Sequence, residues 1–339
     1  MLTSQKETIS QFTDRRNAEK KLFTAGPASL VAENLYGLMP CFGRGDSQYD
    51  EVEERVLAHL RKLTGHGHLA RLQGSGSTAL EVMITNFSYG KVLVIDTGYY
   101  SDRAAKMAEV ASACYGEITS VEKINWKLID NVSGSYDWVI GCYTETSIGL
   151  KQDITKLKRM CSKIGAKLML DATASVGLED GHELADAISF SSCKGLFGLT
   201  GAGFIAFHER PNFCPSSFSL SLNNHLNKMM TGPYHAICSL DYVLEKHSDF
   251  RYAVEASKEK FIRDYEDRLV FDPADQPKLC TQVSGRVVSQ DPKSILYTPR
   301  SLAEGFGVIC HLGEVHLGRE AVGAINDVLE VQFEISDKK

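Results

Sequence analysis

The feature that most constrains the fold of this chain is a set of three short apolar runs within residues 167–207. Their sequences are LML, AISF and GFIAF, and each run is bounded by glycine or polar residues. This is the pattern of strands that are buried on both faces. Between Leu69 and this stretch, further strand-like runs alternate with segments of helical spacing. The alternation predicts an α/β fold with a mainly parallel sheet covered by helices on both faces.

An acid and a lysine follow two of these predicted strands. The first run ends on Asp171, and Lys194 comes shortly after the second. Open α/β sheets bind their ligands at the carboxyl ends of the strands. A carboxylate and an amine held there suit pyridoxal phosphate (PLP), because a lysine forms its Schiff base and an acid partners its ring nitrogen. On these two residues alone, a surface lysine and a helix-capping aspartate would be the better explanation.

The length of 339 residues fits one large domain with a smaller satellite. Beyond Phe207 the sequence becomes loop-like, and a long helical stretch is then predicted from about Ala236 to Leu269. Short alternating segments follow and indicate an α+β unit. We therefore expect a large domain over residues 1–245, including the N-terminal segment, and a small C-terminal domain over residues 246–339.

Charge and composition favour a cytoplasmic protein that binds neither nucleic acid nor membranes. The net charge is −6 and there is no basic cluster of the kind that binds nucleic acid. No apolar run approaches the ~20 residues of a membrane span, and the N-terminal residues lack the apolar centre of a signal peptide. The nine cysteines include no CxxC pair. No metal site is expected, since neither His66/His68 nor His311/His316 has a neighbouring carboxylate or cysteine at ligand spacing.

A glycine-rich turn offers a phosphate site. In LQGSGSTA, Gly74, Gly76 and the small Ala79 lie between a predicted strand and a predicted helix. Free backbone amides at such a helix N-terminus bind phosphate groups. The same spacing matches the dinucleotide fingerprint, and Asp96 ends a strand at about the right distance beyond it. The turn alone thus leaves a nicotinamide-dependent oxidoreductase open, although that reading gives Lys194 and Asp171 no role.

Eight segments together resemble fold-type I PLP enzymes of aminotransferase class V, and within that class the transaminases of 2-aminoethylphosphonate and pyruvate. They are TAGPASL, LQGSGST, DTGYYSDR, YTETSIG, LMLDATASVG, SFSSCKG, SFSLSLN and TGPYH. The SFSLSLN segment (217–223) points to the phosphonate branch. The resemblance implies a PLP-binding large domain with a mainly parallel seven-stranded sheet and a smaller α+β C-terminal domain. It also implies an amino donor, a 2-oxo acid acceptor and a homodimer.

The resemblance also implies roles for individual residues. Lys194 would bind PLP covalently and shuttle a proton, and Asp171 would keep the ring nitrogen protonated. Tyr100 would stack on the ring, and Thr146 would hydrogen-bond near its phenolic oxygen. Thr231, in TGPYH, would reach the phosphate of the neighbouring subunit. The remaining phosphate ligands would be Ser75, Gly76, Ser77 and Ser191.

One position departs from the family. The family has an arginine that grips the acidic group of the substrate, and Val308 stands at that position here. Because an unpaired buried anion is costly, we expect Arg44 or Arg300 to take over this role, with His311 a less direct candidate. The alternatives are another class V enzyme, such as an alanine–glyoxylate or serine–pyruvate type aminotransferase or a lyase, or a scaffold that has lost the chemistry.

Overall fold

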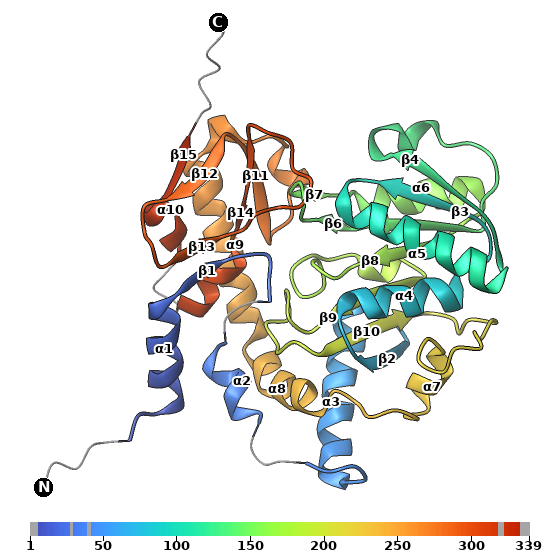
Figure 1. The fold of residues 1–339 in the computed structure, drawn as a ribbon, viewed down its shortest axis with the longest axis horizontal. Helices are drawn as coiled ribbons and strands as arrows, with labels where there is room; N and C mark the ends of the chain where they lie inside the picture. The colour runs from blue at the N-terminus through green and yellow to red at the C-terminus, as the bar shows by residue number, and fades with distance from the viewer. Residues whose placement is uncertain (1–5, 28–29, 39–41, 318–321, 333–339) are drawn as a thin grey trace, which may run out of the picture.

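The computed structural model describes residues 6–27, 30–38, 42–317 and 322–332, and Figure 1 shows their arrangement. A seven-stranded sheet forms the centre, in the order β2-β10-β9-β8-β5-β3-β4. Strand β10 is antiparallel to both of its neighbours, and the other neighbouring pairs are parallel. The predicted mainly parallel seven-stranded sheet is therefore confirmed. Its strands are β2 (His68–Gln73), β3 (Gly90–Asp96), β4 (Ile118–Asn125), β5 (Trp138–Cys142), β8 (Lys167–Asp171), β9 (Ala187–Ser191) and β10 (Ala202–Phe207).

Alternating side chains on the strands form two separate cores. In β3, Val92 and Val94 belong to one core, whereas Leu93 and Ile95 belong to the other. Successive residues of a strand point to opposite faces, so a continuous apolar run is buried on both sides. The first core includes residues of α4 (Gly76–Phe87) and α5 (Tyr99–Tyr115). The second core includes residues of α3 (Ser47–Thr64), α6 (Ile154–Ile164) and α8 (Tyr234–Glu245).

The ends of α3 and α6 are set by capping residues in the local sequence. Asp46 caps the start of α3 by accepting a hydrogen bond from the Gln48 amide, and Gly65 ends the helix in the left-handed conformation. Asp153 and Gly165 do the same for α6. An oxygen-bearing cap and a C-terminal glycine satisfy backbone groups that the helix cannot pair internally.

The C-terminal part is built on α9 (His247–Asp264) and short antiparallel strand pairs. Strand β11 (Cys280–Ser284) pairs with β14 (Phe306–Cys310), and β12 (Arg286–Ser289) pairs with β15 (Leu329–Gln332). This is the expected α+β composition. The helical stretch predicted from about Ala236 to Leu269 is divided into two helices, because α8 ends at Glu245 and α9 starts at His247. Shorter elements are α2 (Ala32–Tyr36), β6 (Thr144–Glu145), β7 (Leu150–Lys151), α7 (Leu222–Leu226) and α10 (Ala324–Val328).

The N-terminal segment lies against this C-terminal part (Figure 1). It comprises α1 (Ile9–Glu19) and β1 (Lys21–Phe23), and β1 runs parallel to β13 (Ser294–Leu296). Phe23 is buried in one cluster with Phe261 and Ile309. The division into residues 1–245 and 246–339 stays a prediction. Its boundary lies at the break between α8 and α9, while these contacts tie the first strand to the second unit.

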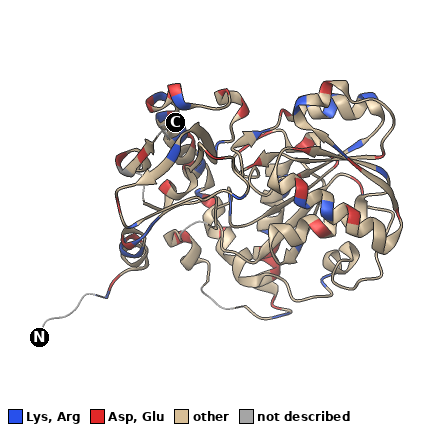
Figure 2. Cartoon of the chain, turned by 45° about the horizontal axis from the view of Figure 1, so that its top comes forward, with Lys and Arg blue, Asp and Glu red and all other residues tan. Residues whose placement is uncertain are grey.

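Charges of both signs are interspersed over the two parts of the molecule in the view of Figure 2. Among the described residues, no helix is both long enough and apolar enough to cross a membrane. The expectation that the chain binds no nucleic acid stays a prediction.

Candidate active site

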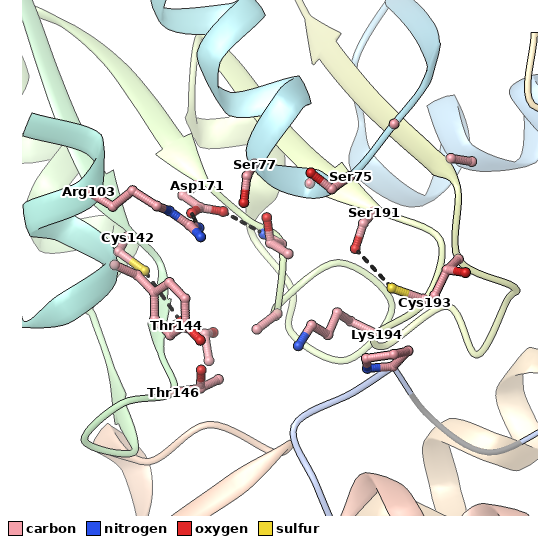
Figure 3. Close-up of a pocket in the computed structure, with 18 of the residues that line it drawn as sticks. Ser75, Ser77, Arg103, Cys142, Thr144, Thr146, Asp171, Ser191, Cys193 and Lys194 are labelled. Atoms are coloured by element: carbon pink, nitrogen blue, oxygen red, sulfur yellow. Dashed lines mark hydrogen bonds and ion pairs between the residues drawn. The ribbon is translucent and has the colours of Figure 1, made fainter. Parts of the chain in front are cut away.

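A cavity of about 470 Å³ opens at the carboxyl ends of β8 and β9, beside the first turn of α4. Figure 3 shows polar side chains from several elements converging on it. The lining residues are Pro27, Gly74, Ser75, Gly76, Ser77, Tyr100, Arg103, Cys142, Thr144, Thr146, Asp171, Thr173, Ala174, Ser191, Cys193, Lys194, Thr200, Gly201 and Ala202. Eight of the nine predicted cofactor-binding residues line this cavity: Ser75, Gly76, Ser77, Tyr100, Thr146, Asp171, Ser191 and Lys194.

Asp171 and Lys194 both face this cavity, as the strand pattern predicted (Figure 3). Asp171 is the last residue of β8 and is only 4% exposed. One of its carboxylate oxygens accepts a hydrogen bond of 3.0 Å from the Thr173 amide. Burial lowers the pKa of Lys194 from its usual value. A lowered pKa leaves more of the amine neutral, and the neutral amine is the nucleophile.

The loop containing Gly26 packs directly on Lys194. The lysine Nζ donates hydrogen bonds to the carbonyl oxygens of Ala25 and Gly26. Gly26 has a φ of +95°, and a Cβ atom there would lie 2.8 Å from Lys194 Cδ and 2.9 Å from the Cys193 carbonyl oxygen. Glycine is needed at this position for both its backbone conformation and the close approach. The TAGP segment therefore holds the lysine side chain.

The first turn of α4 forms one end of the cavity. Ser75 is the N-cap of this helix, and its hydroxyl accepts a hydrogen bond from the Thr78 amide. The first amides of a helix have no intrahelical acceptor, and they attract anions together with the helix dipole. A Cβ atom on Gly76 would lie 2.8 Å from Thr173 Oγ1, so glycine allows this turn to approach the end of β8 closely. Ser191, at the end of β9, also lines the cavity.

The first turn of α5 is fixed by a buried acid, Glu145. Its carboxylate accepts hydrogen bonds from the backbone amides of Tyr100 and Ser101 at 3.1–3.3 Å. Ser147 donates to it through its hydroxyl group. Burial raises the pKa of Glu145, although these donors oppose the shift. These contacts attach the start of α5 to β6, the strand directly before Thr146. Tyr100 and Thr146 both line the cavity.

Arg103 is a cavity residue to which sequence reasoning gave no role. Its guanidinium lies 3.7 Å from the second carboxylate oxygen of Asp171 and 4.8 Å from the centre of the Tyr100 ring. Arg103 was part of the DTGYYSDR segment, three positions after Tyr100. That spacing puts both residues on one face of a helix, and it is the signal that could have identified Arg103.

Thr231 and Arg44 do not line this cavity. Both are exposed and lie around a second hollow of about 450 Å³. Thr200 and Gly201 line both hollows, so the two adjoin each other. Gly232 lets the segment that carries Thr231 pack against Arg71, because a Cβ atom on Gly232 would lie 2.8 Å from the Arg71 guanidinium. Arg71 in turn forms a buried 2.6 Å ion pair with Glu53.

Of the predicted substrate-binding residues, Arg300 lies near the first cavity without lining it. Its Nη1 donates a 2.9 Å hydrogen bond to the hydroxyl of Tyr99, the residue before Tyr100. Val308 is buried in the C-terminal part, in a cluster that also contains the cavity residue Ala174. His311 is wrong as a candidate, because it is fully buried and pairs with the Thr281 hydroxyl at 3.0 Å.

Asp96 gives the dinucleotide interpretation no support. It ends β3 as expected, but it is absent from the residues that line the cavity. Its carboxylate lies 3.7 Å from the ammonium group of Lys123 and accepts a hydrogen bond from Ser101.

Comparisons with known proteins find relatives of similar sequence. No protein-family model matches the chain. The chain is 26% identical over 258 residues to a 2-aminoethylphosphonate–pyruvate transaminase of Pseudomonas fluorescens, which covers 68% of this chain and 69% of that relative. It is 27% identical over 254 residues to the same-named protein of Pseudomonas aeruginosa, covering 67% and 68%. The resemblance inferred from the eight segments is confirmed.

Solved structures show the fold. Alanine–glyoxylate aminotransferase from Nostoc sp. superposes with a TM-score of 0.75 at 18% identity, covering 89% of this chain and 92% of that one. Pyridoxamine–pyruvate aminotransferase from Mesorhizobium loti gives a TM-score of 0.76 at 18% identity, covering 90% of each chain. The chain thus has the fold-type I architecture of the class V PLP-dependent aminotransferases.

Proposed function

We propose that the chain is a PLP-dependent transaminase that moves the amino group of 2-aminoethylphosphonate, or of a similar small amine, to pyruvate. The observation that carries this proposal is the placement of Lys194 and Asp171 in one cavity beside the N-terminus of α4. The names of the relatives in Pseudomonas species supply the donor and the acceptor.

The residues of the cavity fit PLP. The volume of about 470 Å³ lies in the range of small-ligand pockets. The helix end at Ser75, Gly76 and Ser77 suits its phosphate group, and the buried Asp171 suits its ring nitrogen. When bound, PLP would accept and return the amino group and withdraw electrons from the substrate carbon. Lys194 would hold the cofactor and move the proton, since its lowered pKa keeps part of the amine neutral.

The other assigned residues would orient the ring. Tyr100 would stack on one face, and Thr146 would donate a hydrogen bond near the ring oxygen. Ser191 would add a hydroxyl group at the phosphate end. Each of the three lines the cavity, which supports these roles.

We further propose a homodimer located in the cytoplasm, in which Thr231 completes the phosphate site of the neighbouring subunit. In support, Thr231 is exposed on its own chain and lies outside its own cavity. Thr231→Ala should weaken PLP binding by roughly 1.5–3 kcal/mol, the contribution of a hydrogen bond to a charged group. Sedimentation of a fully active monomer would contradict the composite site.

An acidic donor needs a cation, and Arg300 and Arg44 are the candidates. Arg300 donates a hydrogen bond to Tyr99, the neighbour of the cavity residue Tyr100. Arg44 lines the adjoining hollow. Arg300→Ala or Arg44→Ala should raise the Michaelis constant for 2-aminoethylphosphonate, because an arginine fork binds such groups through two bonds. Lys106→Ala, on the exposed side of α5, is the matched control.

The second candidate is a class V aminotransferase with a different donor, and Val308 at the position of the family's arginine favours it. The assay that decides uses the PLP-loaded protein with pyruvate and compares 2-aminoethylphosphonate with neutral amines. Formation of alanine from the phosphonate supports the proposed donor. Faster reaction of the neutral amines would reject it while leaving the transaminase reading in place. Absence of PLP binding, together with binding of NAD, would reject both.

A further inference from the structure

Arg103 contacts two residues to which the proposed function gives separate tasks. It lies on α5 one turn beyond Tyr100, and it lines the cavity. Its guanidinium lies over the Tyr100 ring at 4.8 Å from the ring centre. One of its terminal nitrogens lies 3.7 Å from Asp171 Oδ2, while the other oxygen of Asp171 accepts from the Thr173 amide. Figure 3 shows the Arg103 side chain directed toward the Asp171 carboxylate.

The surroundings of Arg103 hold the side chain in this place. Glu145 fixes the first turn of α5 through the amides of Tyr100 and Ser101. Ala104 and Ala105, the next residues of the helix, are buried against the sheet. Arg103 Nε is buried and has no hydrogen-bond acceptor among the described residues. The guanidinium is therefore positioned by the helix and keeps a free donor.

From this geometry we infer that Arg103 is a positioning residue of the cofactor site, which acts through the Asp171 carboxylate. The inference rests on the proposed binding of PLP. Arg103 supplies a positive charge that faces the buried Asp171 carboxylate and holds it in place before the cofactor binds. Arg103 also contacts Tyr100, the residue proposed to stack on the cofactor ring, so one side chain positions both Tyr100 and the Asp171 carboxylate.

The physical reason is the burial of Asp171. Removing Arg103 would leave a carboxylate that is only 4% exposed without the cation that faces it, which is costly. A carboxylate that is no longer held in one orientation would form a poorer charge-assisted hydrogen bond with the ring nitrogen. Removing Arg103 should thus weaken PLP binding by way of Asp171, even though Arg103 is not required to touch the ring.

The test is a double-mutant cycle on the dissociation constant of PLP. Arg103→Met removes the charge and keeps an unbranched side chain, and Arg103→Lys keeps the charge. Each is measured in the natural background and in Asp171→Asn, which keeps the shape of the carboxylate. Lys106→Met, three positions further along α5 and exposed, is the control for the loss of a cation from this helix. Thermal unfolding of the apoproteins shows that every variant is folded.

We expect Arg103→Met to raise the dissociation constant about tenfold or more, because the buried carboxylate loses the cation it is paired with. Arg103→Lys should recover part of the loss. In the Asp171→Asn background the same change should raise it less than about threefold, because the interaction is already absent. An unchanged constant in Arg103→Met, or an equal loss in both backgrounds, would overturn the inference. If the unsubstituted protein does not bind PLP, the proposed function itself fails.

Discussion

At the scale of single residues, the position of the Lys194 side chain depends on a glycine far away in the sequence. Gly26 adopts a φ of +95°, and its missing side chain leaves room for Lys194 Cδ and the Cys193 carbonyl group. Gly26→Ala should cost about 1–2 kcal/mol for the left-handed backbone and should also displace Lys194. We therefore expect a lower free energy of unfolding together with weaker PLP binding.

Gly165→Ala separates these two effects. Gly165 has a φ of +75°, but a Cβ atom there meets no other atom within 4 Å. This variant should lose similar stability in a denaturant titration and should bind PLP as tightly as the unsubstituted protein. Equal PLP binding by both variants would show that the Gly26 loop does not hold Lys194.

Candidate site residues were predictable from the sequence where they end a strand or begin a helix. Asp171 and Ser75 follow from the apolar runs and the glycine turn, because these patterns are local. Arg103 and Glu145 are ordinary charged residues in the sequence. Their roles depend on the approach of α5 to β6 and β8, and no local pattern encodes that approach.

At the scale of elements, α5 depends on an acid supplied by a different segment. Gly98 precedes the helix and has no side chain to cap it, so Glu145 accepts the hydrogen bonds of the first amides instead. Glu145→Gln should lower the free energy of unfolding by about 1–3 kcal/mol, since the neutral amide turns one acceptor into a donor. Glu109→Gln, on the exposed face of α5, is the control and should have little effect. Equal stability of the two variants would exclude Glu145 as the anchor of the helix.

The break between α8 and α9 shows where element prediction failed. Residues 236–269 contain neither glycine nor proline, so the sequence carries no local signal for a break. In the structure, His247 Nε2 lies 2.8 Å from the carbonyl oxygen of Gly195, in the loop that follows Lys194. This tertiary contact places the start of α9 beside the site, and helical periodicity could not reveal it.

At the scale of the whole molecule, buried histidines should make the protein sensitive to acid. Burial lowers the pKa of His66 and His182 to about 4 and that of His316 to about 3, from an ordinary value of 6.5. The unfolded chain then binds protons that the folded chain excludes. Stability should be fully present above pH 6.5 and should fall toward pH 4, by up to about 1.4 kcal/mol per pH unit for each histidine.

His316→Leu tests this prediction, because both ring nitrogens of His316 lack hydrogen-bond partners among the described residues. In denaturant titrations between pH 7.5 and 4, the free energy of unfolding should fall less steeply with decreasing pH for this variant than for the unsubstituted protein. His68→Gln, at an exposed position, serves as the control. Its free energy of unfolding should depend on pH as steeply as that of the unsubstituted protein. A free energy of unfolding that does not change with pH over this range would contradict the account.

The packing of helices on both faces of the sheet was predictable at this scale, because alternating strand and helix patterns admit few topologies. The contact of the N-terminal strand β1 with β13 was not predictable, since the partners are more than 270 residues apart and both are short.

The most direct measurement of the central claim locates the cofactor on the chain. The protein is loaded with PLP, treated with borohydride, digested and analysed by mass spectrometry, with Lys194→Ala as the control. The loaded protein should be yellow, its colour should bleach, and a single peptide, the one that contains Lys194, should be modified. The control should carry no modification at that peptide and should have no transaminase activity. A colourless protein, or modification of another lysine with Lys194 unmodified, would show that Lys194 does not bind PLP.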